Sequence, residues 1–246
     1  MIRIAPGSGA LVWQALGYRA ACDAVDDPRG LTVRSTPRRV TLMQDLVVVP
    51  GVADGSSGQH RSVRLFRKVR LGAVAAAEQE WHGLDELSRR GFRVADPVFF
   101  ARSGERTVVA TRAVRGRPLG ALFLDAGADA SLDAACSFVG VTVRRLHAGG
   151  LVFRDLYWNH LFATDVSLAA EPTFIDVERL LRPRWRWRRW VVKDLAGLVS
   201  SWPFADVAPV ALALVRAYLG AADRALTDAV LAKAARIRRH VPKYGA

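Results

Sequence analysis

A change of residue pattern near residue 116 is the feature that most limits the possible folds of this chain. Before it, short runs in which apolar and polar residues alternate predict strands; after it, longer runs with helical spacing predict helices. A chain of 246 residues suffices for two small lobes, and no internal repeat is visible. We therefore predict an α+β fold with lobes at residues 1–115 and 116–246.

In the first lobe, residues 73–90 predict a helix, because Trp81, Leu84 and Leu87 have helical spacing and Gly91 follows. The other regular segments predict an antiparallel sheet. The sequence assigns no function to residues 1–35, which could simply cover this sheet. The strands are expected at residues 40–42, 46–50, 61–69, 94–100 and 107–113.

In the second lobe, a break at Pro118–Gly120 precedes segments that are mainly helical. Two short stretches, residues 151–154 and 173–176, interrupt them and predict strands. The basic residues 236–243 are expected to be a solvated tail. The helices are expected at residues 132–146, 206–218 and 223–239.

The composition favours an anionic partner. Lys and Arg number 36 against 23 Asp and Glu, so the formal net charge is +13, which suits a polyanion, an anionic membrane face or a phosphorylated ligand. Cys22 and Cys136 are too few for a disulfide framework, which favours a reducing compartment. Because no apolar run reaches the roughly 20 residues that span a bilayer, and no export signal is recognisable, we expect a cytoplasmic protein.

The segment with the most chemical information is LHAGGLVFRDLYWNHLF, residues 146–162, which contains Arg154-Asp155 and Asn159-His160. An apolar run then ends at Asp176, and Lys193-Asp194 follows. Such an order of carboxylates resembles that of the protein-kinase-like phosphotransferases, in which one carboxylate orients the acceptor hydroxyl while another holds Mg²⁺ against the ATP phosphates.

This order of motifs resembles the protein-kinase-like phosphotransferases, and within them the lipopolysaccharide core kinases that phosphorylate Kdo or heptose. The resemblance covers roughly residues 60–205, and its motifs are specific jointly rather than singly. They stand here as Arg154-Asp155, Tyr157, His160, Ile175-Asp176 with Arg179, Arg184–Trp190 and Lys193–Ala196.

The resemblance implies a two-lobed protein-kinase-like fold that uses ATP and Mg²⁺, with ATP between the lobes. It implies that Asp155 is the catalytic aspartate and that Asp176 binds the metal. His160 occupies the position of the usual metal-binding Asn, with Asn159 beside it as a rival. Asp194 would brace the catalytic loop through its backbone.

In the nucleotide-binding lobe, the resemblance implies that a strand lysine pairs with a helix glutamate. Glu80 matches the glutamate. Arg64, Arg67 and Lys68 all lie on the expected strand, and Lys68 is preferred as the only lysine among them.

The chain departs from the family pattern in its phosphate-covering loop, which lacks a clean Gly-x-Gly-x-x-Gly; residues 35–39 or 51–58 would have to serve. Phe153 also stands where many kinases have His. Two alternatives therefore stay open: a phosphotransferase for another small molecule or protein hydroxyl, and an inactive kinase-like module that binds a membrane or partner. The presence of both Asp155 and Asp176 favours an active kinase.

Residues 182–193, RPRWRWRRWVVK, contain six basic residues and three Trp. The Trp could pack while the Arg side chains extend to solvent, or the segment could contact an anionic glycolipid or the cytoplasmic face of the inner membrane. Nucleic-acid binding is disfavoured because it would leave the aspartates unexplained. The predicted reaction moves the γ-phosphoryl group of ATP to a sugar hydroxyl of a lipopolysaccharide precursor.

Overall fold

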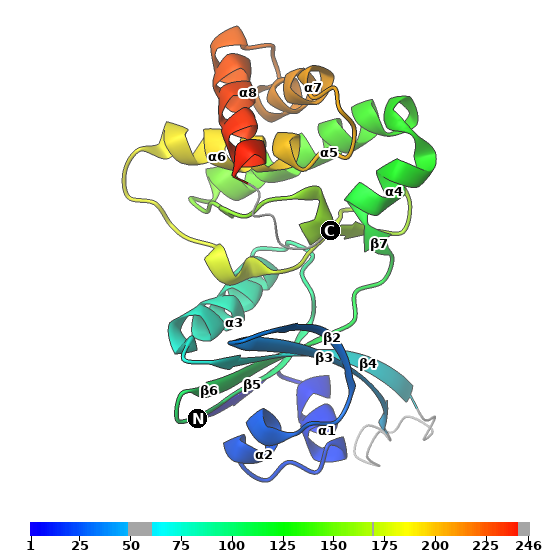
Figure 1. Cartoon of the computed structure of the whole chain (residues 1–246), viewed down its shortest axis with the longest axis vertical. Coiled ribbons are helices and arrows are strands. Elements are labelled where there is room, and N and C mark those ends of the chain that lie inside the picture. The colour runs from blue at the N-terminus through cyan, green and yellow to red at the C-terminus, as the bar shows by residue number, and fades with distance from the viewer. Residues whose placement is uncertain (49–60, 169, 241–246) are drawn as a thin grey trace. The chain divides into compact units, whose positions relative to one another are not determined.

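The computed structural model describes residues 1–48, 61–168 and 170–240. The chain divides into two compact units, Met1–Val114 and Arg115–Ala246, whose boundary falls beside the change of pattern seen in the sequence (Figure 1). The first unit is built on a sheet and the second is mainly helical.

The first unit contains a six-stranded sheet, counted over the described residues, in which all neighbouring strands are antiparallel. The segments expected as two strands at 40–42 and 46–50 form one strand that ends at Val48, and residues 49–50 lie outside the described part. In spatial order the strands are β1 (Ile2–Ile4), β5 (Pro97–Ser103), β6 (Arg106–Arg112), β4 (Arg61–Leu71), β3 (Arg39–Val48) and β2 (Leu31–Thr36).

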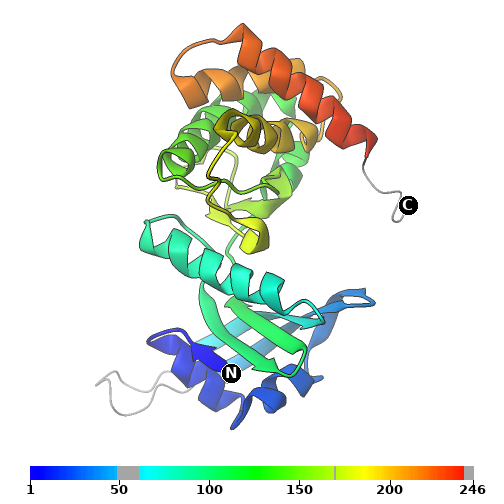
Figure 2. The same ribbon diagram turned by 90° about the vertical axis from the view of Figure 1, so that its left-hand side faces the viewer.

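Helices cover both faces of this sheet (Figures 1 and 2). Helix α3 (Val74–Arg89), which the sequence predicts, lies on one face, while α1 (Ser8–Ala15) and α2 (Ala21–Asp26) lie on the other and were not predicted. Because successive strand side chains point to opposite faces, Phe99 packs edge-on against Trp13 at 5.1 Å, whereas its neighbour Phe100 faces Trp81 at 6.4 Å. The sheet therefore has an apolar layer on each side.

The layer under α1 and α2 is a continuous apolar core. It joins Val12, Trp13 and Leu16 of the N-terminal segment to Leu65 and Phe99 of the sheet. Covering these side chains removes apolar surface from water, at about 25 cal/mol for each Å². Residues 1–30 are therefore an integral part of the first unit and not an appendage.

The second unit is a helical layer in which α5 packs against α7, and α6 against α8 (Figure 2). The helices expected at 132–146, 206–218 and 223–239 are confirmed, and the sequence did not delimit α4 or α6. No helix in the described ranges has the length and apolar character needed to cross a membrane. The helices are α4 (Leu119–Ala126), α5 (Ala128–Ala148), α6 (Trp187–Ser200), α7 (Ala208–Leu219) and α8 (Arg224–Arg239).

A small sheet of β7 (Arg117–Pro118), β8 (Leu161–Ala163) and β9 (Thr173–Phe174) holds the loops that carry the candidate site. Two 3₁₀ turns, η2 (Trp158–His160) and η3 (Val177–Arg179), flank these strands. The strand expected at 151–154 is wrong: Val152 makes only an isolated bridge with Leu181. Residues 151–154 form a loop and not a strand, because no further bridge among the described residues continues the pairing on either side of Val152.

Candidate functional site

The loop that carries Asp155 is held from below by a buried aspartate of α6. Asp194 is 0% exposed and accepts hydrogen bonds from the backbone N–H groups of Phe153 and Arg154, each at 2.7 Å. His147 Nε2 lies 3.2 Å from the same carboxylate. Hydrogen bonds to a charged acceptor are the strong ones, so they fix the backbone immediately before Asp155. The predicted bracing role of Asp194 is confirmed.

The backbone itself is strained at two positions of this site. Arg154 and Asp176 have φ angles of 70° and 57°, in the left-handed region that non-glycine residues rarely adopt. Each such position costs on the order of 1–3 kcal/mol, which the surrounding contacts must offset. One of these contacts is the Arg154 guanidinium, which lies 5.6 Å from the centre of the Trp190 ring of α6. The contacts around these two positions therefore hold the backbone at Asp155 and Asp176 in a conformation that it would rarely adopt alone.

The Asp155 carboxylate is paired with Arg179 of η3. Arg179 Nη1 donates to both carboxylate oxygens, at 3.0 Å each. This contact orients the carboxylate between two loops that lie far apart in the sequence. In the sequence, Arg179 stands out only by its place after the Ile175-Asp176 motif, and nothing in that spacing identifies Asp155 as its partner.

His160 joins the Asp155 loop to Asp176. Its Nδ1 donates to the backbone carbonyl of Asp155 at 2.7 Å, so Nε2 is the ring nitrogen that this contact leaves available. Nε2 lies 3.9 Å from a carboxylate oxygen of Asp176. Asn159 lies elsewhere: its side-chain oxygen sits against Gly120 of α4, where an added Cβ would approach it to 2.5 Å. Of the two metal-ligand candidates, the structure brings His160 beside Asp176.

These residues fit a divalent cation bound chiefly by Asp176. Mg²⁺ at phosphate-transfer sites takes one or two carboxylates together with substrate phosphates, and Asp176 offers such an oxygen. His160 Nε2 lies close to the same carboxylate, although imidazole is a softer ligand than Mg²⁺ prefers. We infer that Asp176 is the principal ligand and His160 a secondary one.

The first unit places Lys68 against Glu80. The Lys68 ammonium lies 2.6 Å from the Glu80 carboxylate, which is buried and also pairs with Arg70. The strand register puts Lys68 opposite Thr41 and Val109, on the face that α3 covers. Of the three strand residues considered, Lys68 is the one that lies against Glu80; Arg64 is half exposed and pairs with Asp45 at 2.7 Å.

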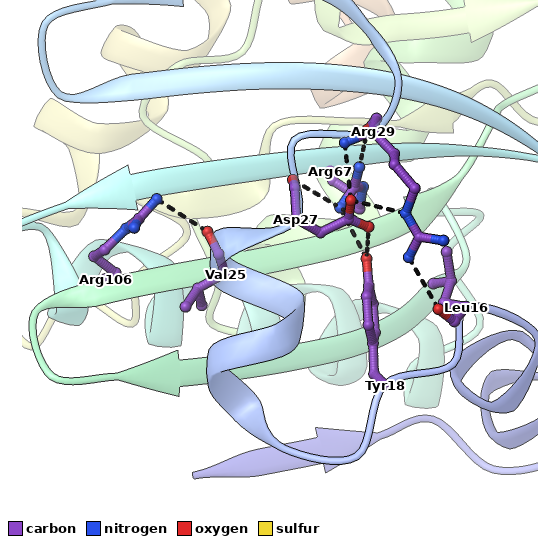
Figure 3. Close-up of polar contacts among 7 residues, drawn as sticks. All are labelled: Leu16, Tyr18, Val25, Asp27, Arg29, Arg67 and Arg106. Carbon is purple, nitrogen blue, oxygen red and sulfur yellow. Dashed lines mark hydrogen bonds and ion pairs between the residues drawn. The ribbon is translucent and has the colours of Figure 1, made fainter.

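Arg67 points to the opposite face, into a polar network (Figure 3). It is 0% exposed, and its Nη1 lies 2.9 Å from both the Asp27 carboxylate and the Tyr18 hydroxyl. Burial by itself raises the pKa of Asp27, but hydrogen bonds from Arg29 and Tyr18 outweigh it and hold the pKa at about 2. Arg67 is thus a structural residue that ties the N-terminal segment to the sheet.

Of the two segments that could cover the phosphates, only residues 35–39 lie within the described part of the chain. Residues 35–39 span the turn from β2 to β3, where Thr36 pairs with Arg39 across the two strands. Residues 51–58 lie outside the described residues.

In the segment 182–193, Trp185 and Trp190 have different surroundings. Trp185 is 78% exposed, whereas Trp190 is partly buried and its ring contacts the guanidinium groups of Arg154 and Arg189. Trp190 therefore packs within the second unit, as one alternative for this segment predicted, whereas Trp185 is exposed and available for the surface contact that the other alternative predicted.

The expectation of a solvated tail is wrong for the start of the basic run 236–243. Arg238 donates to the carbonyls of Ser200 and Trp202, each at 3.0 Å, and so ties α8 to the end of α6. Arg236 lines a hollow of the second unit. The reason is that α8 continues to Arg239 and packs along α6; residues 241–243 lie outside the described part.

Comparison with known proteins gives one family. Residues 59–218 match the model of the lipopolysaccharide kinase (Kdo/WaaP) family. No curated protein matches the chain. The matched span is more than half of the chain and contains Lys68, Asp155, Asp176 and Asp194. The chain therefore belongs to this family of kinases, and its sheet unit and helical unit are the two lobes of a protein-kinase-like fold.

Proposed function

We propose that this protein transfers the γ-phosphoryl group of ATP to a sugar hydroxyl, of Kdo or heptose, in the inner core of lipopolysaccharide. Family membership supports the kinase reaction. The observation that carries the residue assignment is the Asp155 loop, whose two preceding backbone amides are held by the buried Asp194. Such preorganisation lets a carboxylate orient an acceptor without reorganising during the reaction.

In this proposal the second unit handles the acceptor. Asp155 accepts a hydrogen bond from the acceptor hydroxyl and takes its proton as the new P–O bond forms and the bond to the ADP leaving oxygen breaks. Arg179 keeps the carboxylate in its orientation. Asp176, with His160, would hold Mg²⁺, which supplies positive charge against the phosphate oxygens.

The first unit would bind the nucleotide. The Lys68 ammonium donates to phosphate oxygens, and Glu80 holds that ammonium in position through the 2.6 Å ion pair. Because Glu80 is buried and pairs with Arg70 as well, its own position is fixed by α3 and β4 together.

The test is phosphate transfer from ATP to dephosphorylated lipopolysaccharide in the presence of Mg²⁺. Asp155→Asn should lower kcat about 100-fold to 10,000-fold, the usual contribution of a general base. Asp228→Asn is the matched control, because Asp228 is an exposed aspartate of α8, and it should transfer at the wild-type rate. Equal rates in both variants would remove Asp155 from the mechanism. Tight ATP binding by the wild-type protein without transfer would favour another acceptor or an inactive module.

We also propose that residues 182–189 contact an anionic membrane surface peripherally. Trp185 supports this, because its ring is exposed among basic residues, a combination suited to a headgroup region. Trp185→Ala should weaken cosedimentation with phosphatidylglycerol vesicles several-fold, whereas Leu212→Ala, which removes an exposed apolar residue of α7, should not. Equal effects of the two variants would contradict a contact at Trp185.

A further inference from the structure

Five cationic side chains surround one hollow in the second unit, which we name the cationic hollow. Helices α6 and α8 pack side by side (Figure 2), and the hollow of about 530 Å³ opens between their basic side chains. Its lining contains no Asp or Glu. The lining residues are Arg188, Arg189, Val192 and Lys193 of α6 and Lys233 and Arg236 of α8.

These charges have no carboxylate partner in the described structure. Within residues 1–48, 61–168 and 170–240, none of the five cations forms an ion pair; Arg189 makes only a cation–π contact with Trp190. Elsewhere on the same unit, basic side chains do pair, as Arg145 does with Glu171. Like charges gathered around one hollow repel one another, and a bound anion would remove that cost.

The cationic hollow also reaches the candidate catalytic loop. Burial lowers the pKa of Lys193, while the charge of Asp155 raises it and that of Lys233 lowers it, so Lys193 lies within electrostatic range of both. A second hollow, of about 470 Å³, shares Lys233 and Arg236 and is lined by Tyr157, which follows Asp155 closely in the chain. Two residues of the cationic hollow, Lys233 and Arg236, thus also line a hollow that contains Tyr157, two residues after Asp155.

We propose that the cationic hollow binds a phosphate monoester already present on the glycolipid acceptor and thereby positions the acceptor beside Asp155. This inference rests on the proposed function. A phosphate monoester carries about −1.5 to −2 charges at neutral pH and offers three strong acceptor oxygens. Arg and Lys side chains converging from two helices match that charge and number of acceptors, and a neutral sugar would not satisfy them.

The experiment measures binding without ATP, so that it does not depend on catalysis. Intact and phosphatase-treated lipopolysaccharide, each in detergent micelles, are titrated into the full chain by calorimetry. Lys233→Gln/Arg236→Gln removes two cations of the hollow. Arg144→Gln/Arg216→Gln removes two exposed cations of α5 and α7 and gives the same net charge.

For the wild-type protein, intact lipopolysaccharide should bind about 10-fold to 100-fold more tightly than the treated form, and the hollow variant should lose that difference while the control keeps it. In a transfer assay on lipopolysaccharide that keeps its other phosphates, the hollow variant should raise KM and leave kcat nearly unchanged, as expected for positioning residues. Equal weakening in both double variants, or equal affinity for both forms of lipopolysaccharide, would overturn the proposal.

Two further outcomes distinguish failure of the phosphate site from failure of the proposed reaction. Competition by an oligonucleotide, equal to that by intact lipopolysaccharide, would overturn the acceptor assignment in favour of a general anion surface. If the wild-type protein shows the expected binding pattern but transfers no phosphate, the proposed reaction fails while the phosphate site stands.

Discussion

Arg67 and Lys68 are adjacent on β4 and have opposite surroundings. Successive side chains of a strand point to opposite faces, so Lys68 meets Glu80 under α3 while Arg67 meets Asp27 under α2. A shift of the register by one residue would exchange them and would place the wrong cation against Glu80. The buried Arg67 network therefore helps to specify which strand residue faces the candidate nucleotide site.

Arg67→Met should lower the free energy of unfolding by about 3–5 kcal/mol, because it leaves the buried Asp27 without that charge partner. Arg64→Met makes the same substitution on the same strand, but the side chains of Arg64 and Asp45 are each 53% exposed, so the loss should be about 0–1 kcal/mol. Urea unfolding of the two variants checks this. Equal midpoints would show that the network contributes little to stability.

Asp27 should also make the first unit sensitive to acid. Its pKa is about 2 in the folded chain against an ordinary 3.8, so its contribution is fully present above about pH 4 and is lost as the pH falls toward 2. The loss should be about 2 kcal/mol. Unfolding measured between pH 5 and pH 2 should fall less steeply for Asp27→Asn than for the wild-type protein; parallel slopes would contradict this assignment.

Helix α6 braces the Asp155 loop at two points. Asp194 accepts hydrogen bonds from the backbone amides of the two residues before Asp155. Gly197, about one turn further along α6, lies directly against the backbone of Leu156, the residue after Asp155. A Cβ at Gly197 would come within 2.3 Å of the Leu156 carbonyl oxygen, so only glycine allows this close approach. The position of the loop is thus a property of the whole helix and not of the Asp155 motif alone.

Gly197→Ala should destabilise the chain by about 1–3 kcal/mol, because the obstructing atom is backbone. Gly120→Ala is the matched control on α4: there the obstructing atom is the end of the Asn159 side chain, which can rotate, and alanine gains about 1 kcal/mol of helix propensity. Thermal unfolding should show a lower Tm for Gly197→Ala only. A lowered Tm for Gly120→Ala alone would mean that Asn159 is the more rigid group.

At the scale of the molecule, the N-terminal segment completes the first unit. Trp13, Leu16 and Tyr18 cover the face of the sheet that carries Phe99, and Arg67 pairs with Asp27 of the same segment. A sheet with one apolar face uncovered would expose a large patch to water. The sequence assigned no function to residues 1–35. The structure shows that the part up to Arg29 has a structural role, because it covers the sheet.

Deletion of residues 1–30 should abolish cooperative unfolding and cause aggregation, because it removes α1, α2 and Asp27 together. The measurement is size-exclusion chromatography followed by thermal unfolding. Deletion of residues 241–246 is the control for shortening the chain. A monomeric, cooperatively folded product of the first deletion would show that the sheet needs no such cover.

Local patterns in the sequence predict most of the regular elements and the identity of the candidate site residues. Helix α3, the central part of α5, helices α7 and α8, and the motifs around Asp155 and Asp176 depend on residue types and spacing within short stretches, and these are visible without a fold. The bracing by Asp194 was also predictable, since it follows from a motif.

The pairing of Arg179 with Asp155, the opposite environments of Arg67 and Lys68, and the cationic hollow between α6 and α8 were not predictable from those patterns. Each depends on contacts between residues far apart in the chain or on a strand register. Periodicity shows which side chains share a face, but the partner of that face is set when helices and strands pack and bury it. For that reason the residue types pointed to the chemistry, and packing determined which residues meet.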